Sequence, residues 1–193
     1  MRRCFPLLLV LTLTLSACAE NLHEAHEPPC AALIGGGSYC LQASSAVAPF
    51  DLRQKVEIGF RGRRETLILN LENDADGLRF VGLTPFGHKL LQVSYDNHAA
   101  SAALLPDSRL RPSLLIALLQ IALWPADVVH KGLRAPLTLE ENASERRLMN
   151  AGEPTLSITH EEGPPPWPKL HLSVPAAGLE IDIETLPEVS PAL

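Results

Sequence analysis

The sequence predicts a mainly β domain in which a short helical insertion interrupts a series of antiparallel strands. Apolar and polar side chains alternate with period two across 52–95 and again across 179–184. Between them lies a continuous apolar segment, 114–124, bounded by prolines. We expect about nine strands in a sheet curled around an apolar helix, which leaves a concave apolar face that forms either an ordinary core or a ligand site.

Four strands joined by tight turns are expected in the first half of the domain. In the first of them, Val56, Ile58 and Phe60 share one face. Turn-forming residues, glycine among them, separate the strands at 61–63, 74–77 and 85–87. The expected strands are 52–60, 66–72, 78–84 and 89–95. Sequential strands with tight turns indicate an antiparallel meander.

The apolar insertion is expected to form a helix over 114–124. Pro112 fits the first helical turn, Pro125 ends the helix, and Gln120 is its one strongly polar residue. A helix that is apolar all round and too short to span a membrane is expected to be buried or to lie in a groove. A second short helix is expected at 126–133.

The remainder of the domain returns to strands. The expected strands are 137–139, 146–150, 155–160, 169–174 and 179–184. Strict alternation of apolar and acidic residues makes the last of these the clearest. The proline-rich segment 163–168 is expected to be an exposed loop.

The N-terminus has the pattern of an export signal. Arg2 and Arg3 precede an apolar run, 5–15, that is far shorter than the ~20 residues of a membrane-spanning helix. The run ends in Leu15-Ser16-Ala17-Cys18, which resembles a bacterial lipobox, in which the cysteine is acylated and becomes the first mature residue. An ordinary secretory signal cleaved nearby is the alternative.

This pattern sets the expected organisation of the chain. Residues 1–17 are the signal peptide, 18–29 the lipidated cysteine with a flexible tether, 30–186 the domain and 187–193 a disordered tail. Ala19 follows the cysteine in place of the aspartate that retains enterobacterial lipoproteins at the inner membrane. We therefore expect a lipid-anchored protein on the periplasmic face of the outer membrane.

The charge of the mature chain argues against a nucleic-acid partner. Once the signal with its two arginines is removed, the chain has 14 basic and 22 acidic residues and a net charge of −8. The basic clusters are limited to Arg61-Gly62-Arg63-Arg64 and Arg146-Arg147. Tracking a nucleic-acid duplex requires many more cationic phosphate contacts.

Two cysteines of the mature domain, Cys30 and Cys40, form a candidate disulfide. They lie ten residues apart around a run of three glycines, in a compartment that favours oxidation. Such a short closed loop stabilises a fold by about 2–3 kcal/mol. Zinc binding would need two further ligands, and the spacing of His23 and His26 does not favour it. No metal or cofactor is expected.

Three segments carry a resemblance to a known family: Thr84-Pro85-Phe86-Gly87, Tyr95-Asp96-Asn97 and the helix end 119–125. With 78–91 at its centre, the layout resembles the lipoprotein-localisation proteins LolA and LolB. It is more similar still to a branch of LolB-like lipoproteins often found beside aryl-polyene and fatty-acid-synthase-like gene clusters. The resemblance extends loosely over 30–186, and the cysteine pair and the segment 163–168 depart from LolB.

The resemblance implies an unclosed antiparallel half-barrel covered by short α-helices, with an apolar cavity for acyl chains. A LolB-type protein receives acylated cargo from a soluble periplasmic carrier and passes it to the outer membrane. A protruding loop between its third and fourth strands carries an exposed apolar residue, and Phe86 matches that position. The alternative is that Phe86 folds back into the core, as most phenylalanines do.

Apolar residues on the inner faces of strands and helix are the candidate ligand contacts. They are Leu67, Leu69, Leu71, Leu91, Val93, Leu115, Leu118, Leu119 and Trp124. Each can equally be an ordinary core residue, because a dry core and a lipid cavity have the same composition.

Two other functions remain open beside non-enzymatic delivery of an acylated or aryl-polyene lipid. One is a structural lipoprotein that tethers an envelope assembly through its surface, without an internal ligand. The other is an envelope hydrolase, although Gly37-Ser38 lacks the strand and glycine spacing of a nucleophile elbow. Its candidate residues are Ser38, His88, His98, His130, His160 and His171. No catalytic residue is assigned.

Overall fold

A computed structural model describes residues 29–187, whose main feature is an antiparallel sheet of ten strands in the order β7-β6-β5-β4-β3-β12-β11-β10-β9-β8. One half of the sheet contains β3 (Phe50–Phe60), β4 (Arg63–Asp74), β5 (Gly77–Leu83), β6 (Lys89–Tyr95) and β7 (Ala100–Leu104). The other half contains β8 (Leu137–Glu141), β9 (Glu145–Asn150), β10 (Glu153–His160), β11 (Lys169–Val174) and β12 (Leu179–Thr185). The mainly β prediction is confirmed.

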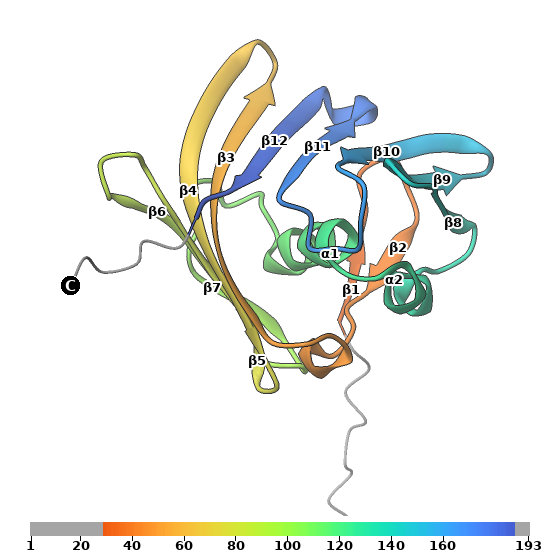
Figure 1. Ribbon diagram of the computed structural model, residues 1–193, viewed down its shortest axis with the longest axis horizontal. Coiled ribbons are helices and arrows are strands. Elements are labelled where there is room, and N and C mark those ends of the chain that lie inside the picture. Colours follow the sequence, from red (N-terminus) through yellow and green to blue (C-terminus); the bar gives the residue numbers. More distant parts are fainter. Residues whose placement is uncertain (1–28, 188–193) are drawn as a thin grey trace, which may run out of the picture.

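Two helices connect the two edge strands of the sheet. Helices α1 (Pro112–Leu123) and α2 (Ala126–Gly132) lie between β7 and β8 in the chain. The sheet curves around α1 and its edges remain unpaired with each other, so the fold is an unclosed half-barrel with a helical insertion (Figure 1). Among the described residues, neither helix has the length and apolar character that crossing a membrane requires.

The turns between the first strands have the chemistry that the sequence indicates. The β3–β4 hairpin has a two-residue turn in which Arg61 and Gly62 both take positive φ angles, 48° and 80°. At the β4–β5 turn, Asp74 Oδ1 accepts the backbone N–H groups of Asp76 and Gly77 at 2.8 and 3.0 Å. The predicted meander of β3 to β6 is therefore confirmed.

Three strands were not predicted. Strand β7 presents mainly exposed small residues at a sheet edge, so it lacks apolar alternation. Strands β1 (Cys30–Ala32) and β2 (Ser38–Cys40) have three residues each and form a separate hairpin. Short 3₁₀ turns follow β2 (η1, Ser44–Ala46) and β11 (η2, Pro175–Ala177).

The proline-rich segment 163–168 is only in part the exposed loop that the sequence predicts. Its Trp167 is 1% exposed, and the indole Nε1 donates a hydrogen bond to the Gly163 carbonyl at 2.8 Å. The indole also stacks on His160, with ring centroids 3.7 Å apart. Burial of a large aromatic side chain outweighs the turn character of the prolines around it.

Candidate functional site

The nine residues predicted to face a ligand lie on the inner face of the sheet and on the helix α1, with its C-cap Trp124, that the sheet encloses. Five of them are buried in the core: Leu67, Leu69, Leu71, Val93 and Trp124. Four are half-buried and pack against that core: Leu91, Leu115, Leu118 and Leu119. The fold thus gathers all nine around one apolar cluster, buried at its centre and partly open at its edge.

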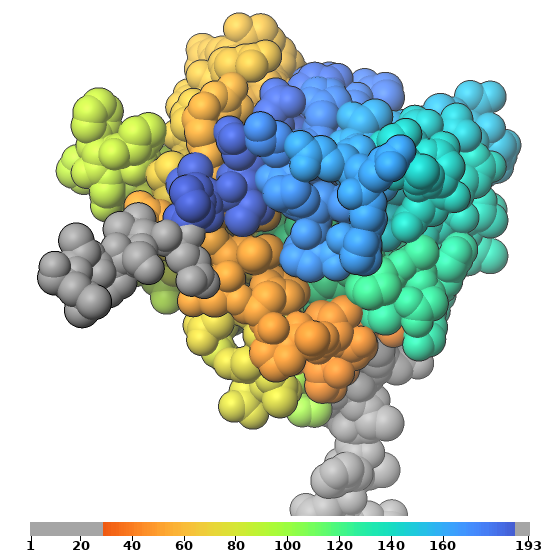
Figure 2. All heavy atoms as spheres, viewed as in Figure 1, coloured from red at the N-terminus to blue at the C-terminus, as the bar shows by residue number. Residues whose placement is uncertain are grey.

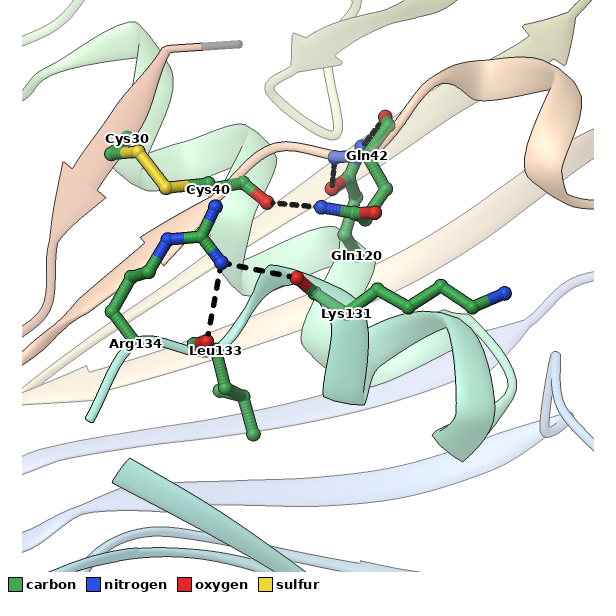
Figure 3. The surroundings of a disulfide bond; sticks show 7 residues. All are labelled: Cys30, Cys40, Gln42, Gln120, Lys131, Leu133 and Arg134. Carbon is green, nitrogen blue, oxygen red and sulfur yellow. Dashed lines mark hydrogen bonds between the residues drawn. A yellow bond between two sulfur atoms is a disulfide. The ribbon is translucent and has the colours of Figure 1, made fainter. Parts of the chain in front are cut away.

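The C-terminal half of α1 is hydrogen-bonded to the segment that directly follows the β1–β2 hairpin (Figure 3). Gln120, buried in the helix, accepts the backbone N–H of Gln42 and donates to its carbonyl, both at 2.9 Å. The Gln42 side chain in turn donates to the Cys40 carbonyl at 2.7 Å, and a disulfide joins Cys40 to Cys30. The one strongly polar residue of the predicted helix therefore has a structural role.

Arg146 holds the same end of α1 from the sheet side. It lies on β9 with a fully buried side chain, and its Nη1 donates to the carbonyls of Ile121 and Trp124 at 2.6 and 2.8 Å. Its Nε pairs with Glu141 at 2.5 Å, and its guanidinium lies 4.7 Å from the ring centroid of Trp167. A cation bonded to the last carbonyls of a helix also favours the helix dipole.

The burial of Arg146 separates the two members of the basic pair Arg146-Arg147. Arg147 alone faces solvent, where it pairs with Glu140 at 3.1 Å. The period-two pattern of β9 could have identified the difference, because Arg146 shares a face with the buried Leu148 two residues later.

Two buried tyrosines lie in the core beside this anchored end. The hydroxyl groups of Tyr39 and Tyr95 and the Nη2 atom of Arg146 have no hydrogen-bond partner among the described residues. Burial raises the pKa of Tyr95 to about 12, with the Asp96 carboxylate adding to the shift. Burial is the main cause that raises the pKa of Tyr39, and the neighbouring Tyr95 adds to the increase. The positive charge of Arg146 acts in the opposite direction.

The N-terminal half of α1 is held less firmly. Its N-cap residue, Arg111, makes no side-chain capping bond, and the first turn contains no acidic residue. In its first turn Leu114 and Leu115 pack only partly into the core, whereas Ile116 and Ala117 that follow them are fully buried. Leu118 and Leu119, in the second half of the helix, are also half-buried. An uncapped helix end with half-buried side chains is a place where local opening costs little free energy.

The β5–β6 turn presents Phe86 to solvent. Phe86 is 90% exposed, about twice as much as any other large apolar residue in the described part of the chain. Backbone bonds from Thr84 to His88 (2.8 Å) and from Gly87 to Thr84 (2.9 Å) close the turn beneath it. The β5–β6 hairpin, yellow-green in Figure 2, projects from the body of the molecule. The alternative that Phe86 folds back into the core is therefore wrong.

The outer face of the sheet is charged. A shallow groove of about 470 Å³ runs across β3, β12, β11 and β10. In it His171 lies between two carboxylates, 2.7 Å from Asp182 and 3.0 Å from Glu180. A second hollow, of about 170 Å³, lies beside Arg79 on the same face. Paired charges of this kind form a solvated surface and provide no apolar binding site.

The hydrolase candidates, Ser38 and five histidines, are spread over separate elements of the fold. Within the described part of the chain, no hydrogen bond joins the Ser38 side chain to His88, His98, His130, His160 or His171. His160 is committed to its stack on Trp167 and to the Glu161 carbonyl, 2.8 Å from its Nδ1. The same described residues contain no group of three potential ligands that could hold a metal ion.

A comparison with known families places most of the chain in one of them. Residues 51–187 match DUF3261, described as a protein of unknown function. The chain belongs to the DUF3261 family. No curated protein matches the chain.

The DUF3261 region covers nearly all of the half-barrel. It runs from the second residue of β3 to just beyond β12, and so includes α1, Arg146 and Phe86. The hairpin with Cys30 and Cys40 precedes it. The matched DUF3261 region therefore contains the sheet and the helix that it encloses, while the disulfide and the Gln42 contact to α1 lie outside it.

Proposed function

We propose that this DUF3261 protein is a LolB-like outer-membrane lipoprotein that binds an acylated or aryl-polyene lipid and delivers it to the outer membrane without catalysing a reaction. It would be anchored on the periplasmic face through acyl chains on Cys18, which lies outside the described residues. A soluble periplasmic carrier would supply the cargo.

The observation that carries the proposal is the exposure of Phe86. A phenylalanine at a projecting turn, 90% exposed, gains nothing for the fold. Full burial of its ring in an apolar phase is favourable by about 1.5–3 kcal/mol. The turn therefore suits brief contact with a bilayer, where cargo is released.

The half-barrel supplies the second part of the proposal. Its concave apolar cluster is partly open along Leu91 of β6 and the N-terminal half of α1. Because the first turn of α1 is uncapped and its Leu114 and Leu115 are half-buried, displacement of that turn would open space for an acyl chain between helix and sheet. The anchored C-terminal half would keep the helix attached during this movement.

The lipid anchor completes the geometry. A single myristoyl chain binds membranes only marginally, whereas two or more acyl chains anchor a protein durably. The residues between Cys18 and Pro29 reach about 40 Å when extended. An anchor of this reach allows the half-barrel to turn Phe86 toward the bilayer.

A binding measurement tests the cargo. The mature chain with Cys18→Ser, free of its own acyl groups, is titrated with a fluorescent fatty acid. We expect saturable binding, and extraction of the protein from its native membrane should yield a co-purifying lipid by mass spectrometry. Absence of both would contradict the proposal.

A vesicle measurement tests the role of Phe86. We expect Phe86→Ser in the same chain to weaken binding to vesicles of outer-membrane lipids by about tenfold. Leu104→Ser is the matched control, because Leu104 is also an exposed apolar residue but lies on the edge strand β7. Equal effects of the two substitutions would remove the special role of the turn.

The dense packing of the core favours a second candidate function. Trp124, Ile116 and Ile121 are buried to 1% exposure or less, so α1 already fills the centre of the concave face. A lipoprotein that tethers an envelope assembly through its surface requires no internal ligand. Crosslinking in cells that captures one protein partner, together with a lipid-free extract, would support this function over cargo delivery.

A further inference from the structure

The β3–β4 hairpin carries a second exposed phenylalanine, Phe60, on the concave side of the sheet. In the register of β3 and β12, Phe60 pairs with Leu179 and Ile58 with Ile181. Directly opposed residues of an antiparallel pair project from the same face. Phe60, two residues beyond Ile58, therefore continues the apolar face that lines the interior.

Burial increases steadily along this face from the hairpin tip to the core. On β3, Phe60 is 43% exposed, Ile58 is half-buried and Val56 is 5% exposed. On β12, Leu179 and Ile181 are half-buried and Ile183 is buried. The two strands form one continuous apolar strip from solvent to the centre of the half-barrel.

The end of the strip projects beyond the neighbouring strand. Strand β5 pairs with β4 only as far as Ile68, opposite Leu83, so residues 63–67 of β4 have no β5 neighbour. Figure 1 shows the β3–β4 hairpin extending past the rest of the sheet. The strip is thus accessible at its outer end.

The tip above the strip carries unpaired positive charge. Arg61 and Arg63 flank Gly62 in the turn, and within the described residues neither forms an ion pair. The Arg61 guanidinium lies 5.1 Å from the centre of the Phe60 ring. Arg64 points to the outer face, where it pairs with Glu57 at 3.4 Å.

Most arginines of the strands differ from this arrangement, although Arg53 of β3 also forms no ion pair within the described residues. Arg79, Arg146 and Arg147 each pair with a carboxylate. The chain as a whole has a net charge of −6, so free acidic partners are plentiful. Glu65 of β4 lies opposite Ile58 on the same face, so one carboxylate borders the strip beside the two guanidinium groups and the rim stays net positive. A net positive rim above an apolar strip is complementary to an amphiphile with an anionic head and an apolar chain.

We propose that the strip is the access route of the cargo, and that the cargo is an acyl or polyene chain with an anionic head group. Arg61 and Arg63 hold the carboxylate or phosphate head at the rim, while the chain lies along Phe60, Ile58 and Leu179 toward the core. This inference rests on the proposed function, because it names the substrate class and the access route of that same site.

The test compares charged and neutral probes on the mature chain with Cys18→Ser. The probes are a fluorescent fatty acid, its methyl ester and a fluorescent lysophosphatidate. The variant is Arg61→Asn with Arg63→Gln, since asparagine before glycine preserves the turn. The control is Arg53→Gln, an exposed arginine of β3 on the outer face. Melting temperatures of all variants establish that each is folded.

We expect the double variant to bind the fatty acid about three- to tenfold more weakly and the ester unchanged, with the control unaffected. A parallel loss for lysophosphatidate would identify phosphate as an accepted head, and its absence would restrict the head to carboxylate. Phe60→Ser should weaken all bound probes alike, because it removes part of the strip.

Other outcomes separate the two levels of the proposal. Saturable binding of acid and ester with equal affinity, unchanged in the double variant, would overturn the anionic head and leave lipid binding intact. No saturable binding of any probe would overturn the proposed function itself. If the double variant lost binding only to anionic vesicles, the arginines would contact the membrane surface, and the access route would be wrong.

Discussion

The two ends of helix α1 differ in how they are held. The C-terminal end is fastened on both sides, by Gln120 to Gln42 of the hairpin segment and by Arg146 of β9 to its last carbonyls. The N-terminal end has no side-chain cap and places half-buried leucines at the edge of the core. One helix therefore combines a fixed end with an end that can open at low cost.

This difference separates stability from function within one element. Hydrogen bonds from a buried charge to helix carbonyls contribute strongly because the alternative is an unsatisfied buried group. Half-buried leucines contribute less to the free energy of unfolding, and they can exchange a contact with the helix or sheet for a contact with an acyl chain. A protein that takes up an acyl chain needs both a firmly bonded region and a region with exchangeable contacts. The acyl chain replaces some helix contacts while the rest of the protein stays folded.

Removing Arg146 should have the largest effect on the fixed end. We expect Arg146→Met to lower the free energy of unfolding by about 3 kcal/mol, because Glu141 and the carbonyls of Ile121 and Trp124 lose their partner. Denaturant unfolding of the Cys18→Ser chain measures the change. Arg147→Met is the control: its exposed pair with Glu140 is worth under about 1 kcal/mol. Equal losses would show that burial of Arg146 does not matter.

Removing the disulfide should have the next largest effect. We expect Cys30→Ser with Cys40→Ser to cost about 2–3 kcal/mol, since the bond closes a short loop in the unfolded chain. The hairpin also supports the Gln42 contact to α1, so near-ultraviolet dichroism of Trp124 should weaken. A double variant with unchanged unfolding would mean that the bond does not form in the cell envelope.

The contrast between the two ends of α1 could be predicted only in part from the sequence. Prolines at 112 and 125 and the apolar run between them predicted the helix, and alternation predicted most strands of the sheet. Arg146 was missed because a charged residue in a short strand suggests solvent, although its spacing from Leu148 indicated the inner face. Trp167 could not be placed, since a lone aromatic among prolines has no periodic context.

The candidate site shows the same division. Inner-face leucines were identified by period two, and the exposure of Phe86 by the resemblance of its turn to the LolB-like loop. The partial burial of the leucines on α1, however, depends on how far the helix reaches across the sheet. That reach follows from contacts between segments that are distant in the sequence. The strip that ends at Phe60 likewise depends on the pairing of β3 with β12, which are more than a hundred residues apart.

The buried tyrosines allow a pH test of the fixed side of the core. Tyr39 and Tyr95 are the only two tyrosines of the chain, so absorbance near 295 nm reports on them alone. The pKa of Tyr95 is raised by burial to about 12, above the ~10 of an exposed tyrosine. Stability should be complete below pH 10 and fall between pH 10 and 12, where only the unfolded state ionises.

The control for this titration is the pair of variants Tyr39→Phe and Tyr95→Phe. Each removes a hydroxyl that has no partner among the described residues, so stability at pH 7 should stay level or rise by about 1 kcal/mol. The high-pH loss should shrink in both. Phenolate absorbance of the folded protein that appears already near pH 10 would place the hydroxyls in contact with water.

The smallest expected effect tests the loose end directly. Arg111→Asp places a capping carboxylate at the N-terminus of α1, where the native residue makes no capping bond. It should stabilise the protein by about 0.5–1 kcal/mol, and Arg111→Gln should recover only the part due to the removed positive charge. If uptake of an acyl chain requires this end to open, the capped variant should bind the fluorescent ester more weakly despite its greater stability.

Stabilisation without any change in affinity for the ester would mean that the acyl chain enters without moving α1. The half-buried leucines would then be ordinary core residues, and the packed interior would favour a tethering lipoprotein over a carrier.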